Sequence, residues 1–396
     1  MLLILFSFSF SDTFVILFAG SNEFYNYRHQ ADISTFYTQI FLKSGINPKN
    51  IITFAYDDIS TSSENPYSGQ IFHSLEHKNI YQGSSTINYF GNQVTADNFY
   101  SVIQNIPSTA SDYLLIYYDN HGGAGTLGVP ENCGDYIYAD SLGQALLNAS
   151  SLNKWNKCLF GIEACDSGSI PPSWSSVQNI LTITASGPDE SSYACTYDSS
   201  LDTYLSNEFT NYWLSFLFQN PSGTVQDLWK YISSYMHQST PQIFGDESIL
   251  SLPISSFFGT LSSVTNERLI NNGEKVDTMK SSHVTYFTLD NLIEKHQSID
   301  VQRKALRTKL LLQLQKKKFK HTLKELIKEA DIKNYYFHLK NKDAPVTSDY
   351  FDCVRYFTKK YGVVHGDFLP KFRIIKSLAS RVAVKYIKEA IDKVIS

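Results

Sequence analysis

The chain has little of several features that would assign it to a class at once. Its 396 residues include five cysteines, too few and too scattered for a disulfide framework, and none forms a close pair of metal ligands. No stretch reaches the roughly 18 consecutive apolar residues that a membrane span needs. No internal repeat is visible. We therefore expect no disulfide scaffold, no stable membrane span and no metal or other cofactor, and at least one free thiol.

Basic residues are scarce in the first two thirds of the chain. Residues 1–260 hold 7 Lys or Arg against 23 Asp or Glu, a net charge of −16, whereas residues 261–396 hold 27 and 15, a net of +12. The whole-chain net of −4 argues against a nucleic-acid partner. The two parts are chemically different bodies, and 42% hydrophobic residues are enough to build a core in each.

The first eleven residues, MLLILFSFSFS, form an apolar run of the length of a signal peptide's central region. They lack the basic residues that usually precede such a run, so a buried first strand is the alternative. The only N-glycosylation sequon, at Asn148, is consistent with secretion. We expect the secretory pathway, with a lysosome- or vacuole-like compartment, the cell surface or the exterior as destination.

Short apolar runs alternate with amphipathic segments up to about residue 260. The runs predict strands, and the segments between them predict helices. The expected strands are 14–19, 51–56, 113–118, 158–162 and 180–185, and the expected helices are 31–43, 96–103, 140–147 and 207–217. This alternation predicts a mostly parallel sheet covered by helices on both faces, with its reactive groups at the carboxyl ends of the strands.

The remainder divides into a polar linker or activation segment, 261–300, and a basic helical region, 301–396. Leu306, Leu310, Leu314, Leu323 and Ile327 give residues 301–330 a helical period. Further helices are expected at 350–361, 367–377 and 381–394. The fold class is therefore α/β for residues 12–260, followed by an all-α region.

Two expected strands lead into reactive side chains. His121 follows the strand at 113–118 and precedes Gly122 and Gly123, and Cys165 follows the strand at 158–162. A thiol and an imidazole at one sheet edge permit nucleophilic catalysis, in which the thiolate attacks a carbonyl and the histidine protonates the departing amine. The alternative is a buried apolar cysteine and an ordinary loop histidine. Glu163 and Asp166 beside Cys165 are poor choices for a sealed core, which favours catalysis.

At these residues the sequence resembles legumains, the asparaginyl endopeptidases, which are cysteine proteases with a caspase-like fold and a C-terminal helical prodomain. The matching motifs are AGSNEFYNYRHQAD (19–32), YDDI (56–59), ENPYSGQIF (64–72), HGG (121–123), EACDSGS (163–169) and ESSYACTYD (190–198). They run in order through nearly all of residues 12–260. The tail resembles the family prodomain more loosely, mainly around residues 350–378.

The resemblance implies a role for each matching residue. Cys165 becomes the nucleophile, His121 its partner and Asn26 the amide that orients the histidine, although Asn26 could instead cap a turn. The backbone N–H groups of Gly122 and Cys165 would bind the oxyanion. The specificity pocket would use Arg28, Glu163 and Ser192, with His29 and Ser191 nearby, although Arg28 could instead be a surface cation paired with Asp32. Groups of both signs suit the asparagine side-chain amide, which accepts and donates hydrogen bonds.

Two positions depart from the family pattern. The residue before the histidine is Asn120, where the family usually has aspartate, which puts peptide ligation in doubt. A pocket aspartate of the family aligns with Asn207, so preference for asparagine, or acid-pH cleavage after aspartate, could be weakened. Neighbouring Glu208 could compensate, although on a helix it would face elsewhere.

The opposite net charges of the two parts predict that the basic tail covers the acidic body. The resemblance implies a zymogen whose prodomain inhibits near neutrality and leaves in acid, when carboxylates with pKa values depressed by lysines lose their charge. Candidate self-cleavage sites are Asn271, Asn272 and Asn291. Protein substrates and cystatin-type inhibitors are the expected partners. The alternatives are a glycosylphosphatidylinositol-transamidase-like enzyme, which usually carries a membrane helix, a catalytically dead binding homologue, and a tail that is merely a solvated helical domain.

Overall fold

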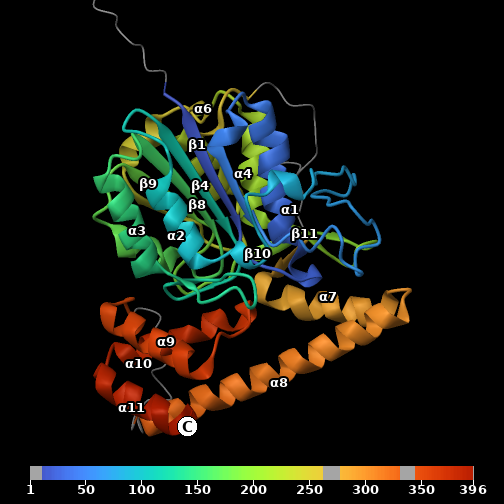
Figure 1. The fold of residues 1–396 in the computed structure, drawn as a ribbon, viewed down its shortest axis with the longest axis vertical. Helices are drawn as coiled ribbons and strands as arrows, with labels where there is room; N and C mark the ends of the chain where they lie inside the picture. Colours follow the sequence, from blue (N-terminus) through green and yellow to red (C-terminus); the bar gives the residue numbers. More distant parts are fainter. Residues whose placement is uncertain (1–10, 262–276, 331–343, 396) are drawn as a thin grey trace, which may run out of the picture.

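The computed structural model describes residues 11–261, 277–330 and 344–395. Residues 1–10 of the expected signal peptide, and the candidate cleavage sites Asn271 and Asn272, lie outside the described residues. Figure 1 shows an upper body built around a sheet and a lower body of helices, with α7 at the junction.

The upper body is built on a seven-stranded sheet in the order β12-β9-β8-β4-β1-β2-β3. Neighbouring strands are parallel except β12, which runs antiparallel to β9 at one edge. The strands are β1 (Thr13–Ala19), β2 (Ile51–Ala55), β3 (Tyr89–Phe90), β4 (Tyr113–Asp119), β8 (Lys157–Glu163), β9 (Ile180–Thr184) and β12 (Gln242–Gly245). The five predicted strands and the mostly parallel α/β sheet are confirmed.

Both faces of this sheet are covered, and β1, which is apolar at every position after Thr13, alternates its side chains between two cores. Phe14, Ile16 and Phe18 pack into the core beneath α2 and α3, whereas Val15 and Leu17 pack into the core beneath α1, α4 and α5. The helices are α1 (Tyr27–Thr35), α2 (Ala96–Asn105), α3 (Ala139–Ser151), α4 (Glu208–Gln219), α5 (Val225–Tyr235) and α6 (Ser255–Phe258).

Two small antiparallel sheets were not predicted. One joins β5 (Gly122–Gly123), β6 (Thr126–Leu127) and β7 (Ile137–Tyr138), and the other joins β10 (Tyr193–Asp198), β11 (Thr203–Asn207) and β13 (Thr278–Lys280). The expectation that residues 261–300 form a linker is corrected for its second part. There β13 pairs with β10, and α7 (Ser281–Lys295) packs on the upper body.

The lower body contains α8 (Ile299–Glu329), α9 (Ser348–Tyr361), α10 (Arg373–Ala379) and α11 (Val384–Ile395). A 3₁₀ helix, Gly366–Phe372, precedes α10, and it includes Pro370, which cannot donate a backbone hydrogen bond. The all-α expectation is confirmed for the described residues of 301–396. Among the described residues no helix is both long enough and apolar enough to cross a membrane.

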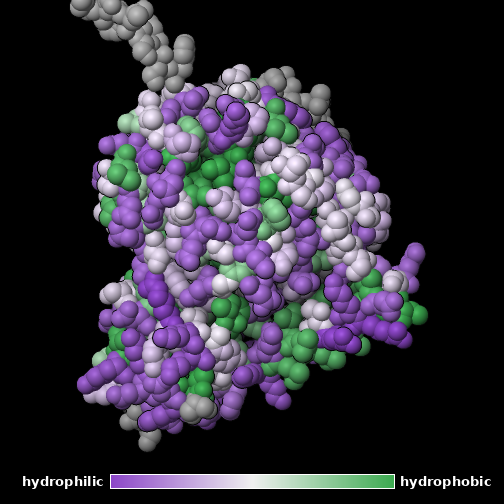
Figure 2. Space-filling view, viewed as in Figure 1, coloured by the Kyte–Doolittle hydropathy of each residue, from purple (hydrophilic) through white to green (hydrophobic). Residues whose placement is uncertain are grey.

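The apolar stripe predicted for α8 is only partly the buried face. Leu310 and Leu314 are 51% and 64% exposed, whereas Leu312 and Phe319 are buried. Figure 2 shows apolar patches on the lower body, where Figure 1 places α7 and α8, among mainly hydrophilic side chains. Only part of α8 is buried, so several leucines of the predicted stripe face solvent.

Candidate active site

The register of β4 and β8 brings His121 and Cys165 to one sheet edge. Asp119 at the end of β4 pairs with Glu163 at the end of β8, and the Asn120 N–H donates to the Glu163 carbonyl at 3.1 Å. His121 and Cys165 each follow two residues later. A Cβ on Gly122 would lie 2.3 Å from the Cys165 carbonyl oxygen, so only glycine allows this approach. The predicted delivery of both groups to the same edge is confirmed.

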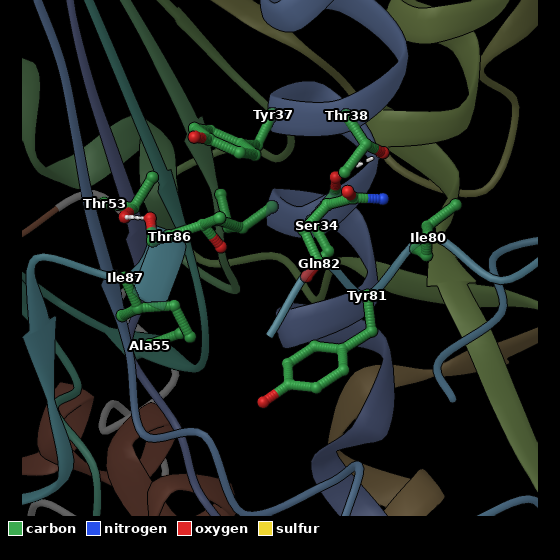
Figure 3. Close-up of a pocket in the computed structure, with 11 residues that line it drawn as sticks. Ser34, Tyr37, Thr38, Thr53, Ala55, Ile80, Tyr81, Gln82, Thr86 and Ile87 are labelled. Atoms are coloured by element: carbon green, nitrogen blue, oxygen red, sulfur yellow. Dashed lines mark hydrogen bonds between the residues drawn. The ribbon is translucent and has the colours of Figure 1, made fainter. Parts of the chain in front are cut away.

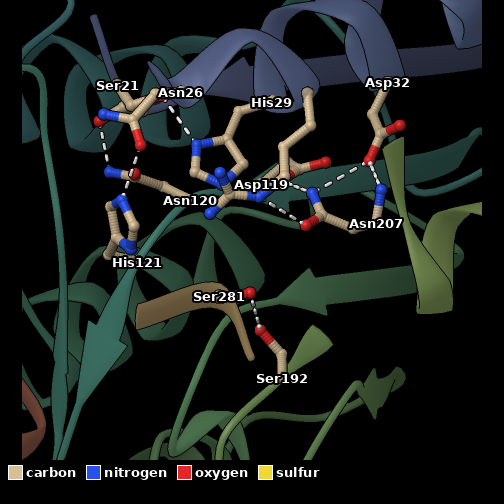
Figure 4. Close-up of polar contacts among 12 residues, drawn as sticks. Ser21, Asn26, His29, Asp32, Asp119, Asn120, His121, Ser192, Asn207 and Ser281 are labelled. Carbon is tan, nitrogen blue, oxygen red and sulfur yellow. Dashed lines mark hydrogen bonds and ion pairs between the residues drawn. The ribbon is translucent and has the colours of Figure 1, made fainter. Parts of the chain in front are cut away.

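Asn26 fixes the imidazole of His121. Its Nδ2 donates to the Asn22 carbonyl at 2.9 Å, so its Oδ1 faces His121 Nε2, 2.8 Å away. Nε2 therefore carries the hydrogen, and Nδ1 of the neutral ring has a free lone pair. Burial, with Arg28 and His365 nearby, holds the pKa of His121 well below its usual value. Asn26 makes no capping bond to α1, so the turn-cap alternative is wrong. Figure 4 shows Asn26 and His121 together beneath α1.

Cys165 is 2% exposed and bounded by Ser192. Its sulfur accepts the Ser192 N–H at 3.4 Å and lies 3.8 Å from the Ser192 hydroxyl. Burial, followed by the charge of Asp166, raises the pKa of the Cys165 thiol to about 12. The nucleophile is therefore a protonated thiol in this closed arrangement.

Arg28 is fully buried, so its interpretation as a surface cation is wrong. Its Nε donates to Asn207 Oδ1 at 2.9 Å, and it does not pair with Asp32. Asp32 instead accepts the backbone and side-chain N–H groups of Asn207 at 3.1 and 3.0 Å. Burial lowers the pKa of Arg28, and nearby acidic side chains oppose that shift. Arg28 Nη2 has no hydrogen-bond partner within the described chain.

The other predicted pocket residues lie around Arg28. His29 Nδ1 contacts the Ser21 hydroxyl at 2.7 Å, and burial holds its pKa well below the usual value, so it is neutral. Burial raises the pKa of Glu163 to about 8, and its buried Oε2 has no hydrogen-bond partner among the residues described. Arg28 Nη2 is an unpaired donor, and Glu163 Oε2 is an unpaired carboxyl oxygen that accepts a hydrogen bond or, when it carries the proton, donates one. Leaving such atoms buried and unpaired costs about 1–3 kcal/mol each, so they are suited to a ligand that offers both kinds of partner.

Residues of the C-terminal helical region (277–395) fill the space over His121. Asp367 Oδ1 lies 3.6 Å from His121 Nδ1, and burial raises the pKa of Asp367 to about 7. A Cβ on Gly366 would lie 2.5 Å from His121 Cδ2, and one on Gly123 would lie 2.3 Å from the Leu369 carbonyl. Backbone atoms of the C-terminal region are therefore in direct contact with the His121 imidazole and with the glycine loop beside it.

Ion pairs tie the basic region to the acidic body, as the charge asymmetry predicts. The carboxylate of Asp166 accepts hydrogen bonds from the Arg373 guanidinium, and the carboxylate of Asp189 accepts one from the Lys376 ammonium group at 3.1 Å. Further pairs are Lys304 with Glu64, Lys295 with Asp202 and Arg355 with Asp140. The expectation that lysines depress the pKa of such carboxylates is wrong for Asp166. Its burial outweighs Arg373 and raises its pKa to about 7.

The described surface also contains a small pocket away from this site. Figure 3 shows it beside α1, with Tyr37, Ile80 and Tyr81 among its walls. Its volume is about 30 Å³, and neither His121 nor Cys165 lines it. The reactive edge itself is packed with C-terminal residues.

The remaining predicted residues fall at varied places. Asn148 is exposed on α3, as glycosylation requires. Ser191 is half-buried next to Ser192. Asn291 is buried within α7 and donates to the Tyr197 hydroxyl at 3.3 Å, so cleavage there requires α7 to unwind. Glu208 starts α4 and is buried, and its Oε2 has no partner in the described part of the chain.

Sequence reasoning missed three contributors to this site. Asp119 accepts a hydrogen bond from the Asn207 side-chain amide, and the hydroxyls of Ser281 and Ser192 are hydrogen-bonded to each other. The carboxyl group of Asp367 faces the His121 ring. The position of Asp119, at a strand end two residues before His121, was an available signal. Nothing local marks Ser281 or Asp367, because their role depends on how the C-terminal region docks.

Comparisons with known proteins agree with this geometry. The profile of the Peptidase C13 family matches residues 13–260. A hemoglobinase of Schistosoma japonicum is 30% identical over 361 residues, covering 87% of this chain and 82% of that protein. Legumain of Mus musculus is 32% identical over 260 residues, 62% of this chain and 59% of that protein. The delta-isozyme of vacuolar-processing enzyme of Arabidopsis thaliana is 33% identical over 271 residues, 62% and 57% of the two chains.

The chain thus spans less than two thirds of the length of these last two relatives. Among solved structures, caspase-1 from Spodoptera frugiperda aligns with a TM-score of 0.39 and 15% identity, over 64% of this chain and 92% of that chain. The family profile covers well over half of the 396 residues and includes both His121 and Cys165. The chain belongs to the Peptidase C13 family, the legumain family of cysteine endopeptidases.

Proposed function

We propose that this protein is an asparaginyl endopeptidase, made as a zymogen and activated in acid when its C-terminal region leaves. The observation that carries the proposal is that an imidazole oriented by Asn26 and a thiol lie at the same sheet edge, beside a buried pocket with two unpaired polar atoms, Arg28 Nη2 and Glu163 Oε2. The asparagine side chain offers the complementary acceptor and donors.

In the proposed reaction, the Cys165 thiolate attacks the carbonyl after asparagine and forms an acyl-enzyme. The backbone N–H groups of Gly122 and Cys165 stabilise the oxyanion. His121, held by Asn26 through Nε2, uses Nδ1 to take the thiol proton and deliver it to the departing amine. Water activated by the same nitrogen then releases the acyl group and restores the thiol.

The substrate strand is proposed to pair with β10. In the closed protein β13 occupies that edge as an antiparallel strand, and the Ser281 N–H donates to the Ser192 carbonyl at 3.0 Å beside Cys165. Strand addition at an open edge is a common mode of peptide recognition. Substrate and the β13–α7 segment would therefore compete for one edge, which supports the zymogen.

The pH response of this latch depends on the sign of each pKa shift. The raised pKa values of Asp166 and Asp367 mean that the closed form holds their protons more tightly, so these two groups favour closure as pH falls from about 7 toward 4. The lowered pKa values of His121 and His365 favour opening below about 6.5. Glu64, with a pKa lowered by Lys304, adds to opening only in stronger acid.

The carboxylates and histidines oppose one another between about pH 4 and 6.5. We therefore propose that release is completed near or below about pH 4, where the closure-favouring contribution of the two aspartates no longer grows and Glu64 loses its charge. The buried histidines, rather than lysine-paired aspartates, supply most of the acid sensitivity.

A cleavage profile of the acid-treated protein on a peptide library tests the specificity, with Cys165→Ser as the inactive control. We expect asparagine to be enriched before the cut, with weaker cleavage after aspartate. A profile without asparagine enrichment would overturn the substrate assignment. Equal activity of the uncut protein at acid and neutral pH would overturn the latch.

The relatives named legumain and vacuolar-processing enzyme support a lysosome- or vacuole-like compartment for this chain. A signal peptide, glycosylation at Asn148 and binding of cystatin-type inhibitors remain part of the same proposal. A catalytically dead homologue is disfavoured because Asn26, His121 and Cys165 are all present and two of them are hydrogen-bonded to each other.

A further inference from the structure

The solvent-facing side of α8 carries a row of exposed leucines. Leu306, Leu310 and Leu314 recur at every fourth position, so they lie on one face of the helix, and Leu311 lies beside them. In chain order these four residues are 46%, 51%, 54% and 64% exposed. Single exposed leucines are ordinary, but four within one short stretch of helix form a contiguous apolar surface, which we call the leucine strip.

Basic residues surround the leucine strip. Residues 301–324 of α8 hold nine Lys or Arg and no Asp or Glu. Arg303 lies three residues before the strip and Lys317 three residues after it, so both share its face. Arg307, Lys317 and Lys318 are exposed. The free side of this helix therefore combines apolar side chains with positive charge, which is the pattern of helices that bind membrane surfaces or acidic grooves.

The other side of α8 is packed against the protein itself. Val301, Ala305 and Leu312 are buried in a core that also holds residues of α7, and Phe319 and Leu323 are buried in the core of the lower body. Figure 1 shows α8 as one long helix along the outer side of the lower body, and Figure 2 shows apolar side chains among hydrophilic ones there. A groove that encloses a whole amphipathic helix cannot form around α8 in this position, whereas a flat surface can reach the strip.

The charges also disfavour a second copy of this chain as the partner. Two α8 helices that face each other, in either direction, would bring Arg303, Arg307 and Lys317 of one copy close to the same cations of the other, and like charges repel. A layer of anionic lipid headgroups has the opposite charge and accepts leucine side chains at its boundary with the acyl chains.

We propose that α8 is a membrane-surface helix, whose leucine strip inserts among the headgroups of an anionic lipid layer while the flanking Arg and Lys side chains bind those headgroups. The helix lies in the plane of the surface and does not span it. The C-terminal region would in this way hold the closed protein at a membrane, and loss of that region would free the catalytic body. Only this last step rests on the proposed function.

The test is sedimentation of the full chain with lipid vesicles, in a Cys165→Ser background that prevents self-cleavage. Its result is therefore independent of the proposed peptidase activity. Vesicles of phosphatidylcholine with and without phosphatidylserine are compared at neutral pH and low salt. The variant Leu310→Gln/Leu314→Gln removes half of the strip, and glutamine is a good helix former. The matched control is Leu75→Gln/Leu152→Gln, because these leucines of the upper body are 63% and 64% exposed.

We expect the parent chain to bind the phosphatidylserine vesicles about 10-fold or more tightly than the neutral ones. Leu310→Gln/Leu314→Gln should weaken this binding by about 10-fold or more, and its control should stay within about threefold of the parent.

Lys317→Gln/Lys318→Gln tests the contribution of charge. It should weaken binding by about 25-fold, since each cation near an anionic surface contributes about fivefold. Its control is Lys49→Gln/Lys230→Gln, which changes two exposed lysines of the upper body and should stay within about threefold of the parent.

A tryptophan in the strip reports insertion directly. The fluorescence of Leu314→Trp should shift to the blue when phosphatidylserine vesicles are added, because the indole leaves water. Leu152→Trp is the control, since Leu152 and Leu314 are equally exposed at 64%, and its spectrum should not change. If Leu310→Gln/Leu314→Gln does not fold, the Leu314→Trp spectrum decides.

Three results would overturn the proposal. The first is no binding to phosphatidylserine vesicles. The second is binding that the lysine variant weakens and the leucine variant does not, because that pattern means adhesion by charge alone. The third is a dimer in analytical ultracentrifugation that Leu310→Gln/Leu314→Gln dissociates, which would assign the leucine strip to a second copy of the chain.

Discussion

At the residue scale, the closed protein keeps its nucleophile in an unreactive form. The pKa of Cys165 is raised to about 12, mainly by burial, and Ser192, which donates to its sulfur, is hydrogen-bonded to Ser281 of the C-terminal region. Removing this region should therefore raise the thiolate fraction, which is the species that alkylating agents attack. We predict that iodoacetamide modifies Cys165 about 100-fold faster at pH 7.5 after removal, because each unit of pKa changes the thiolate fraction about tenfold.

Peptide mass mapping measures this rate, and Cys133 is an internal reference. The sulfur of Cys133 lies near Gly91, Asn92 and Glu131 of the upper body. Cys165→Ser identifies the peptide unambiguously. Equal rates at Cys165 before and after removal would show that the C-terminal region does not control the thiol.

Asn26 should affect turnover more than binding. Asn26→Ala removes the acceptor that holds His121 Nε2, so the imidazole can rotate and change tautomer. One such hydrogen bond is worth about 1–2 kcal/mol, which predicts a fall in kcat of about 10-fold with KM little changed. Steady-state kinetics of the acid-activated enzyme measure both constants. A rise in KM at constant kcat would mean that Asn26 contacts substrate instead.

At the element scale, the sequence predicted what depends on local pattern. The apolar runs that became β1, β4 and β8 are buried on both faces, so their composition alone marks them, and parallel pairing then places His121 and Cys165 together. The strands β10 and β11 were missed because polar residues interrupt their apolar pattern. The sequence predicted a linker at Met279 and Lys280 of β13, because nothing in the local pattern indicates that this segment pairs with β10.

The 3₁₀ helix Gly366–Phe372 is the element that seals the imidazole. Gly366 fits because it has no Cβ, since such an atom would lie 2.5 Å from His121 Cδ2. Gly366→Ala must therefore push this element away from His121. We predict measurable activity of the uncut variant at neutral pH, where we expect the uncut parent chain to be inactive, in a fluorogenic asparagine peptide assay.

Lys371→Ala is the matched control for this change. Lys371 belongs to the same 3₁₀ helix but is exposed, so its truncation should leave the uncut protein inactive. Gel analysis must show that the Gly366→Ala chain stays uncut during the assay. An inactive, folded Gly366→Ala protein would argue that other contacts, such as β13 on β10, are sufficient for inhibition.

At the scale of the whole molecule, ion pairs join the acidic and basic bodies, and the proposed pH response would come from a few buried groups. Exposed pairs such as Lys295 with Asp202 contribute little and weaken with salt. Asp166 and Asp367 titrate near pH 7 in the closed form, and His121 and His365 have lowered pKa values. The proposed latch would therefore be a balance between buried carboxylates that favour closure in acid and buried histidines that oppose it.

The variant Asp367→Asn separates the contribution of this carboxyl group from that of the histidines, because asparagine mimics the protonated carboxyl at every pH. At pH 8 the wild-type closed form must hold an ionised, buried Asp367, whereas the variant does not, so the variant should be the more stable. Near pH 4 the wild-type carboxyl is already protonated and the difference should vanish. Thermal unfolding midpoints, measured in a Cys165→Ser background that prevents self-cleavage, should rise by several degrees at pH 8 only.

The control is Asp392→Asn, because Asp392 is exposed and its carboxylate pairs with Lys360; this variant should give no gain at either pH. An equal gain for Asp367→Asn at both pH values would assign the effect to shape rather than charge, and a loss at pH 8 would mean that the ionised carboxylate stabilises the closed form through His121.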